Sequence, residues 1–313
     1  MSAPSHKEML ISLRTEFGRQ FGDTHGMQLV MAPGRVNLLG DHTDYNDGFV
    51  LPMTVDRGVY LAARERDDSA VRLYSVLYDE LLEYRLDDFV APRPGSWSSY
   101  VTGVVEELRL RGLVETGFEA VIDGNLVLGA GLSSSAALEV ATATALQHLL
   151  GFELGAVDMV RLCQHVEHSY ANVLCGIMDQ FASRVGRKDH ALFLDCRSLD
   201  FRNIPVDLGR HRLLIVSSAV ERSLAASAYN ARRAECHQAV GIFNGIDAGI
   251  RALRDVSAEM LDKHGDGLPP EIRRRCRHVI TENRRVLEAA DCLAEGRLDD
   301  FGALMFASHT SLR

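Results

Sequence analysis

The sequence has no long hydrophobic run. Its 313 residues are 46% hydrophobic and 25% charged, but no segment reaches the roughly 18 uninterrupted apolar residues of a membrane-spanning helix. The longest uncharged stretch, Gly124 to Leu138, is rich in glycine and serine. The N-terminus, Met1-Ser-Ala-Pro-Ser-His-Lys-Glu, also lacks the apolar core of a secretory signal. The composition therefore predicts a soluble globular protein without a membrane partner.

Cysteine and positive charge are scarce as well. The six cysteines are widely spaced and form no Cys-x-x-Cys pair, which excludes the common zinc motifs and favours free thiols in the cytoplasm. The chain has 34 Lys and Arg residues against 43 Asp and Glu residues, a formal charge of −9, so no nucleic acid partner is expected. The one basic cluster, the arginines between positions 273 and 285, is interpreted as a solvated helix face.

The length is typical of two domains, and hydrophobic periodicity indicates both helices and strands. Helices are predicted over residues 1–26, 97–110, 135–150 and 156–171, and strands over 27–31, 59–64, 71–77, 118–122, 191–194 and 213–216. Glycine and proline predict a turn at Ala32-Pro33-Gly34. A hinge at Phe201 to Gly209 would separate a first domain, residues 1–205, from a mostly helical second domain, residues 206–313.

A glycine- and serine-rich loop, Gly129-Ala-Gly-Leu-Ser-Ser-Ser, comes directly before the most strongly predicted helix. The glycines let the backbone approach a ligand closely, the hydroxyls add donors, and the helix start supplies N–H groups and partial positive charge. This combination predicts a phosphate-binding loop. It is neither a Walker A motif nor a dinucleotide-binding fingerprint, because no Gly-Lys-Ser/Thr follows and Ser134 replaces the third glycine. The alternative is an ordinary capped helix after a glycine turn.

A second segment, Gly34 to Gly48, holds more polar functionality than a turn requires. Six different polar residues fall within twelve positions: Arg35, Asn37, Asp41, His42, Asp44 and Asn46. Buried polar groups need partners, so an enclosed segment of this kind predicts a ligand with many hydroxyl groups. Two alternatives stay open. One is a metal site at Asp41-His42-x-Asp44, which the nearby Arg35 disfavours, and the other is a solvated acidic loop.

The third segment, Cys175-Gly-Ile-Met-Asp-Gln-Phe, surrounds Asp179 with the apolar residues Ile177, Met178 and Phe181. Burial raises the pKa of a carboxyl group unless a cation compensates, so Asp179 is a candidate base. The alternative is a helix cap or a member of an ion pair.

Three motifs in this order and spacing resemble the galactokinase family of the GHMP kinases: Gly34-Arg-Val-Asn-Leu-Leu-Gly-Asp-His-Thr-Asp-Tyr, Gly129-Ala-Gly-Leu-Ser-Ser-Ser-Ala-Ala and Gly176-Ile-Met-Asp-Gln. The resemblance implies an α+β, two-domain GHMP kinase fold. The N-terminal domain would hold a mixed sheet plus helices, and the C-terminal domain would be helical with an incomplete sheet. The resemblance also implies ATP-dependent phosphorylation of galactose at its C1 hydroxyl.

The resemblance assigns roles to individual residues. It implies a sugar pocket lined by Arg35, Asp41, His42, Asp44, Gly176, Asp179 and Tyr229, and a phosphate site formed by Gly129, Gly131, Leu132, Ser133, Ser134 and Ser135. Asp179 would take the proton from the C1 hydroxyl, and Arg35 would neutralise developing charge. Ser135 and Glu167 would hold Mg²⁺, and Trp97 and Tyr100 would lie near the adenine. A monomer that works with galactose, ATP and Mg²⁺ is expected.

Two departures from the family pattern bear on function. Position 41 carries Asp where the family usually carries Glu, so a kinase for a related sugar, such as N-acetylgalactosamine, is an alternative. The chain ends at Arg313, before a third, glycine-rich family motif would follow. The second domain is therefore expected to be shortened and to expose apolar surface. A non-catalytic sensor that binds galactose and ATP is the alternative from a different functional class.

Overall fold

The computed structural model describes residues 4–127, 129–216 and 228–313. Contacts divide the chain into two compact units that interleave in the sequence. Unit 1 comprises Met1–Arg35, Val55–Cys175 and Asp179–Val185, and unit 2 comprises Val36–Thr54, Gly176–Met178 and Gly186–Arg313. This division does not follow two successive domains that meet after residue 205. The chain passes from one unit to the other within strands β1 (Gln28–Leu39) and β2 (Phe49–Glu65) and within helix α5 (Met178–Val185).

Unit 1 is built on a mixed sheet. Its strands are β3 (Ala70–Ser75), β4 (Glu80–Arg85), β5 (Phe118–Gly124) and the unit 1 parts of β1 and β2. β5 pairs antiparallel with β2, where Leu61 lies opposite Ile122, and parallel with β3, where Leu73 lies opposite Ala120. β4 pairs antiparallel with β3. Because β5 has a neighbour on each side, its first five residues are buried.

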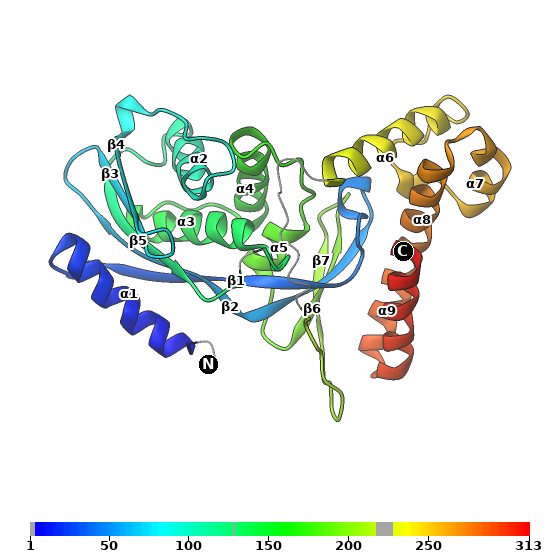
Figure 1. Ribbon diagram of the computed structural model, residues 1–313, viewed down its shortest axis with the longest axis horizontal. Helices are drawn as coiled ribbons and strands as arrows, with labels where there is room; N and C mark the ends of the chain where they lie inside the picture. Colours follow the sequence, from blue (N-terminus) through cyan, green and yellow to red (C-terminus); the bar gives the residue numbers. More distant parts are fainter. Residues whose placement is uncertain (1–3, 128, 217–227) are drawn as a thin grey trace. The chain divides into compact units, whose positions relative to one another are not determined.

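Helices cover both faces of the unit 1 sheet (Figure 1). They are α1 (His6–Phe21), α2 (Trp97–Leu110), α3 (Ser134–Leu150) and α4 (Ala156–Tyr170). Side chains alternate between the faces of a strand, and in β2 Tyr60 and Ala62 pack with Phe17 of α1. Leu61 and Ala63 point the other way and belong to the larger core formed with α2, α3 and α4. The packing of these helices on the sheet fixes the positions of the first residues of α3 and the last residues of α4.

In the residues that the structure describes, unit 2 combines a small part of the sheet with α-helices and short 3₁₀ turns. Its elements are β6 (His190–Asp195), β7 (Phe201–Pro205), α6 (Ala228–Asn244), α7 (Ala258–His264), α8 (Pro270–Ala294) and α9 (Leu298–Leu312), with η1 (Asp44–Asn46), η3 (Leu253–Asp255) and η4 (Gly265–Gly267). β6 pairs antiparallel with the first part of β2 and with β7. Val286 of α8 packs with Leu39 and Leu51, which lie on either side of residues 40–48. Within the described ranges, no helix is both long enough and apolar enough to cross a membrane.

Most elements predicted from periodicity are confirmed, with ends that differ by a few residues. The confirmed helices are those at 97–110, 135–150 and 156–171, together with His6–Phe21 of the predicted lead-in helix. The confirmed strands are those at 27–31, which is the beginning of β1, and at 59–64, 71–77, 118–122 and 191–194. Helix α1 begins with a capping box in which Ser5 and Glu8 bond each other's backbone N–H groups, a local signal that supports the prediction.

Three local predictions are wrong. Ala32-Pro33-Gly34 is not a turn but part of β1, because pairing of β1 with β2 overrides the local preference of proline and glycine. Residues 201–209 include strand β7 rather than forming a hinge, and residues 213–216 form no strand. Strand β4 and helix α5 were not predicted, since both are short.

The arginines of α8 form a solvated face only in part. Arg284 is 83% exposed, but Arg285 is 14% exposed and its Nε donates to the buried Glu282 at 2.7 Å. Arg275 likewise pairs with Glu235. The predicted solvated face is therefore wrong for Arg275 and Arg285, because a carboxylate partner lets a guanidinium group lie inside the unit.

Candidate active site

Arg35 and Asp179 form a bidentate ion pair in unit 1. Arg35 lies on β1, and Asp179 lies in the first turn of α5. The Arg35 Nε donates to Asp179 Oδ1 at 2.8 Å, and Nη2 donates to Oδ2 at 2.7 Å. The side chains are only 13% and 26% exposed, so the paired geometry is well defined. The ion-pair alternative for Asp179 is thus a feature of the structure, whatever else the residue does.

The same pair holds the glycine- and serine-rich loop. Ser133 Oγ donates to Asp179 Oδ2, and Arg35 Nη1 donates to the carbonyl of Gly131 at 2.6 Å. Gly131 has a φ of 72°, which favours glycine. Ser133 also has a positive φ, 57°, which is unusual for a residue with a Cβ atom. In this conformation the Ser133 hydroxyl reaches the carboxylate.

Gly34 lets β1 approach the loop. A Cβ atom at Gly34 would lie 2.5 Å from the Leu126 side chain and 2.7 Å from the Leu132 carbonyl oxygen. The next residue, Arg35, donates its backbone N–H to that carbonyl at 3.1 Å. Glycine is therefore needed at position 34 to bring Arg35 beside the start of α3.

The start of α3 carries a hydroxyl–carboxylate pair. Ser135 Oγ donates to Glu167 Oε1 at 2.7 Å, and Glu167 of α4 is 4% exposed. Burial raises the pKa of Glu167 to about 7, although the Ser135 hydrogen bond acts in the opposite direction. Mg²⁺ is commonly bound by one or two protein oxygens together with waters and phosphate oxygens. The oxygen donors of Ser135 and Glu167 therefore fit Mg²⁺.

A second buried carboxyl group, on Glu139, lies outside the three sequence motifs. Glu139 lies one turn after Ser135 on α3 and is completely buried. Its Oε2 accepts a hydrogen bond from Gln180 Nε2 at 3.4 Å. Burial raises the pKa of Glu139 well above its ordinary value, and the negative charge of Glu167 raises it further. The only sequence signal was a glutamate four residues after Ser135 in an otherwise small and apolar stretch.

Trp97 lies in the first turn of α2. Its Nε1 donates to Glu80 Oε2 at 2.6 Å, and its ring stacks on Tyr78 at a centroid distance of 6.4 Å and an angle of 12°. Tyr78 is 52% exposed, whereas Tyr100 is only 6% exposed and belongs to the core. A flat aromatic surface therefore exists at Trp97, and its second member, Tyr78, was not among the residues predicted from the sequence.

The polar segment from Gly40 to Gly48 folds as an ordered loop of unit 2, the 40–48 loop. Asn37 Nδ2 donates to Asp41 Oδ1 at 3.0 Å, and the buried Thr43 donates its hydroxyl to the Gly40 carbonyl at 2.7 Å. None of the nine loop residues is fully exposed, so the alternative of a solvated acidic loop is wrong. Among the described residues, no group of three or more His, Cys, Asp or Glu side chains could hold a metal ion, and the alternative metal site gains no support.

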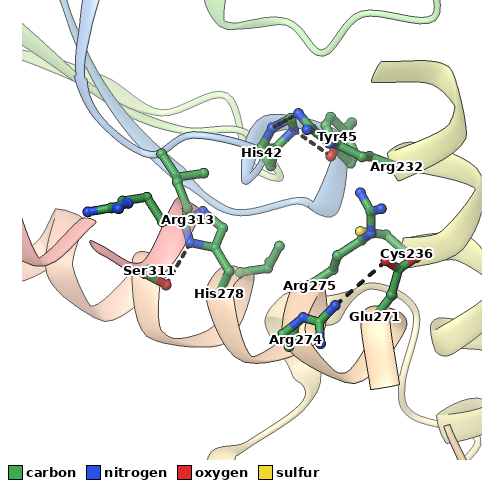
Figure 2. A pocket seen from close by; sticks show the side chains of 12 residues that line it. His42, Tyr45, Arg232, Cys236, Glu271, Arg274, Arg275, His278, Ser311 and Arg313 are labelled. Carbon is green, nitrogen blue, oxygen red and sulfur yellow. Dashed lines mark hydrogen bonds and ion pairs between the residues drawn. The ribbon is translucent and has the colours of Figure 1, made fainter. Parts of the chain in front are cut away.

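His42 is held from two sides (Figure 2). Its Nδ1 lies 2.8 Å from the Tyr45 hydroxyl, and its Nε2 lies 3.4 Å from Arg232 Nη1. A guanidinium group can only donate, so Nε2 is the acceptor and Nδ1 carries the proton. Burial lowers the pKa of His42 to about 4, and the positive charge of Arg232 lowers it as well. The imidazole is therefore neutral near pH 7.

Gly176, Asp44 and Tyr229 lie together in unit 2. The backbone N–H of Gly176 donates to the Tyr229 hydroxyl at 3.2 Å. A Cβ atom at Gly176 would lie 1.9 Å from Asp44 Oδ2, so only glycine fits beside that carboxylate. The Tyr229 ring lies 5.9 Å from the His42 ring. Four of the predicted sugar-binding residues of unit 2 are thus neighbours.

A cavity of about 200 Å³ also opens in unit 2 (Figure 2). Its lining comes from the 40–48 loop, α6, α8 and α9: His42, Tyr45, Arg232, Cys236, Glu271, Arg274, Arg275, His278, Val279, Ser311, Leu312 and Arg313. Of the residues predicted to bind the sugar, His42 alone lines this cavity, so it is not the predicted sugar pocket.

The predicted site residues therefore form two groups, one in each unit. In unit 1 the structure joins Arg35, Asp179, Ser133 and Gly131, and separately joins Ser135 with Glu167. In unit 2 it joins His42, Asp44, Gly176 and Tyr229.

Family profiles match two parts of the chain. The galactokinase galactose-binding signature matches residues 15–65, and the N-terminal domain of the GHMP kinases matches residues 99–187. Galactokinases of Chloroflexus aggregans and Roseiflexus sp. are each 45% identical to this chain. The alignments cover 97% and 96% of this chain and 77% and 76% of those proteins.

Solved structures are also similar to this chain. The crystal structure of Lactococcus lactis galactokinase complexed with galactose is similar with a TM-score of 0.90 and 34% identity, over 97% of this chain and 79% of that one. A D-glycero-D-manno-heptose 1-phosphate kinase has a TM-score of 0.58 at 14% identity. The second likeness concerns the fold alone, which is the α+β GHMP kinase fold expected from the sequence.

Proposed function

The chain belongs to the galactokinase family, and we propose that it transfers the γ-phosphoryl group of ATP to the C1 hydroxyl of galactose, giving galactose 1-phosphate and ADP. The observation that carries this proposal is the Arg35–Asp179 pair beside the glycine- and serine-rich loop. A fixed carboxylate next to a loop with the features of a phosphate site is what transfer to a hydroxyl requires.

In the proposed reaction, an oxygen of Asp179 accepts the proton of the C1 hydroxyl. The C1 oxygen forms a bond to the γ-phosphorus as the bond from that phosphorus to the β,γ-bridging oxygen breaks, and ADP leaves with the electron pair. Arg35 fixes the carboxylate through two hydrogen bonds, and its positive charge offsets the charge that develops during transfer. Ser133 holds the second carboxylate oxygen.

We assign the phosphates of ATP to the loop of Gly129, Gly131, Leu132, Ser133, Ser134 and Ser135. Gly129 and Gly131 have positive φ values and the loop leads into the start of α3, where the unpaired N–H groups of a helix favour an anion. Ser135 and Glu167 would hold Mg²⁺, which when bound neutralises phosphate charge. The aromatic surface of Trp97 and Tyr78 is assigned to the adenine.

We assign galactose to the residues that the family resemblance implies: Arg35, Asp41, His42, Asp44, Gly176, Asp179 and Tyr229. Neutral imidazole, carboxylate and phenol groups provide both donors and acceptors, as recognition of a polyhydroxylated ligand requires. One carboxylate oxygen of Asp41, Oδ1, accepts a hydrogen bond from Asn37 Nδ2. The cytoplasmic location and the monomeric state remain predictions from the sequence.

The proposal is tested by measuring ADP release from the chain of 313 residues with ATP, Mg²⁺ and a panel of sugars. Turnover that depends on galactose, with galactose 1-phosphate as the product, supports it. Turnover only with N-acetylgalactosamine or another aldose would replace the substrate but keep the reaction. Binding of galactose and ATP without any product would favour a sensor.

A further inference from the structure

Three buried polar side chains of α8 face the 40–48 loop, although none belongs to the predicted site. His278, Glu282 and Asn283 are 6%, 0% and 8% exposed. Their spacing of four and five residues puts them on one side of the helix. Polar groups buried to this degree need partners, and each of the three has a backbone partner at one end of the loop.

Glu282 holds the beginning of the loop. Its Oε1 accepts the backbone N–H of Gly40 at 2.8 Å and the hydroxyl of Ser308 at 2.8 Å. Its Oε2 accepts from Arg285 Nε at 2.7 Å. Hydrogen bonds to a charged group are stronger than those between neutral groups, so the carboxylate fixes Gly40 firmly.

His278 holds Asp41, the residue after Gly40. Its Nε2 lies 2.9 Å from the carbonyl oxygen of Asp41. Its Nδ1 lies 2.9 Å from the hydroxyl of Ser311 (Figure 2). A carbonyl oxygen only accepts, so Nε2 carries a proton and donates it. Since the contact is to the backbone, it orients Asp41 without occupying its carboxylate.

Asn283 holds the end of the loop. Its Oδ1 accepts the backbone N–H of Phe49 at 2.9 Å. A Cβ atom at the preceding Gly48 would lie 2.4 Å from that oxygen and 2.7 Å from the Thr43 side chain. The glycine thus permits the close approach of α8 to the backbone.

We propose that His278, Glu282 and Asn283 are positioning residues that set the affinity for galactose by fixing the backbone of the 40–48 loop at residues 40 and 41 and directly after the loop at residue 49. This inference rests on the proposed function, since it takes Asp41, His42 and Asp44 as sugar ligands. If the loop leaves its binding conformation for part of the time, the apparent affinity for galactose falls to the fraction of molecules in which the loop is in that conformation. The Arg35–Asp179 pair is bonded within unit 1, so turnover at saturating sugar depends less on α8.

The test compares three variants on the same helix. Glu282→Ala removes both acceptors and leaves the buried Gly40 N–H without a partner, Glu282→Gln keeps one amide oxygen for it, and Glu288→Gln removes a carboxylate that faces solvent and pairs with Arg284. The dissociation constant for galactose is measured by calorimetry, and kcat and both KM values are measured by ADP release. Glu282→Ala should weaken galactose binding at least about tenfold. Glu282→Gln should lose less, and Glu288→Gln should match the wild type.

The KM for ATP separates positioning from general destabilisation, because a damaged fold would raise it together with the KM for galactose. Asn283→Ala, which removes the acceptor at the other end of the loop, should reproduce the selective loss of galactose affinity. Unchanged galactose binding in both alanine variants, or equal losses for galactose and ATP, would overturn the inference and leave the proposed function intact. No galactose binding by the wild-type chain would overturn the proposed function, and this inference with it.

Discussion

The two units arrange polar groups in different ways. In unit 1 the functional side chains hold one another: Arg35 bonds Asp179, Ser133 bonds Asp179, and Ser135 bonds Glu167. In unit 2 the 40–48 loop is held through its backbone by side chains of α8. The first arrangement is visible in short sequence motifs, because the residues predicted to bind the substrates are themselves the residues that hold one another. The second is not, because the supports come more than 200 positions later.

The largest effect is expected from Asp179→Asn, which should lower kcat. The amide keeps the size of the side chain but cannot act as the base and meets Arg35 with one acceptor only. We expect kcat to fall by roughly two to four orders of magnitude, with a much smaller change in the KM for galactose. Steady-state kinetics measures both. Asp158→Asn, also in the first turn of a helix but exposed, is the matched control, and a similar loss there would show that the effect is not specific.

The second largest effect is expected from Glu167→Gln, which should change how the free energy of unfolding depends on pH. Burial raises the pKa of Glu167 to about 7 in the folded state from an ordinary value of 4.5. The folded state therefore keeps the proton when the unfolded state has lost it, and this group lowers stability as pH rises from about 4.5 to about 7. The total is on the order of 3 kcal/mol.

Denaturant unfolding at several pH values without Mg²⁺ measures this effect. The free energy of unfolding of Glu167→Gln should lack that decline. Ser135→Ala removes a hydrogen bond that favours the charged form, so its decline should extend to higher pH. Parallel curves for wild type and Glu167→Gln would contradict the raised pKa.

Gly176→Ala tests the part of unit 2 that is assigned to galactose. The added Cβ would lie 1.9 Å from Asp44 Oδ2, so the carboxylate must move. Displacement of a ligand by about 1 Å can cost up to about a hundredfold, and we expect the KM for galactose to rise about ten- to hundredfold with a smaller change in kcat. Gly241→Ala on α6, where a Cβ meets nothing within 4 Å, is the control. A rise in the KM for ATP instead would contradict the assignment of this part of unit 2 to the sugar.

The smallest effect is expected at Ser133. Both Ser133→Ala and Ser133→Gly remove the hydroxyl that bonds Asp179, which should lower kcat about tenfold, since such a bond contributes on the order of 1–2 kcal/mol. Only glycine relieves the positive φ of 57°. The glycine variant should therefore be more stable than the alanine variant by about 1 kcal/mol. Thermal unfolding separates the two, and equal stabilities would show that this backbone is not strained.

The elements with strong periodicity could be predicted because their pattern is local. Helix α3 is an example: a glycine- and serine-rich stretch leads into its first residue, Ser134, and Gly151 ends it in a left-handed conformation. The turn expected at Pro33 was wrong because partners for the backbone of β1 come from β2, which no local window contains. Short elements such as β4 lack enough residues to show a period.

The candidate site could likewise be predicted from the sequence only in part. Residue types and spacing were enough to single out Arg35, Asp179 and the glycine- and serine-rich loop as chemically unusual, because their unusual composition is visible in the sequence itself. Folding was needed to show that both oxygens of the Asp179 carboxylate accept hydrogen bonds from Arg35, that Glu139 is completely buried, and that side chains of α8 hold the 40–48 loop. Such contacts join residues remote in the chain, and burial and hydrogen-bond distance are properties of the packed molecule rather than of any segment.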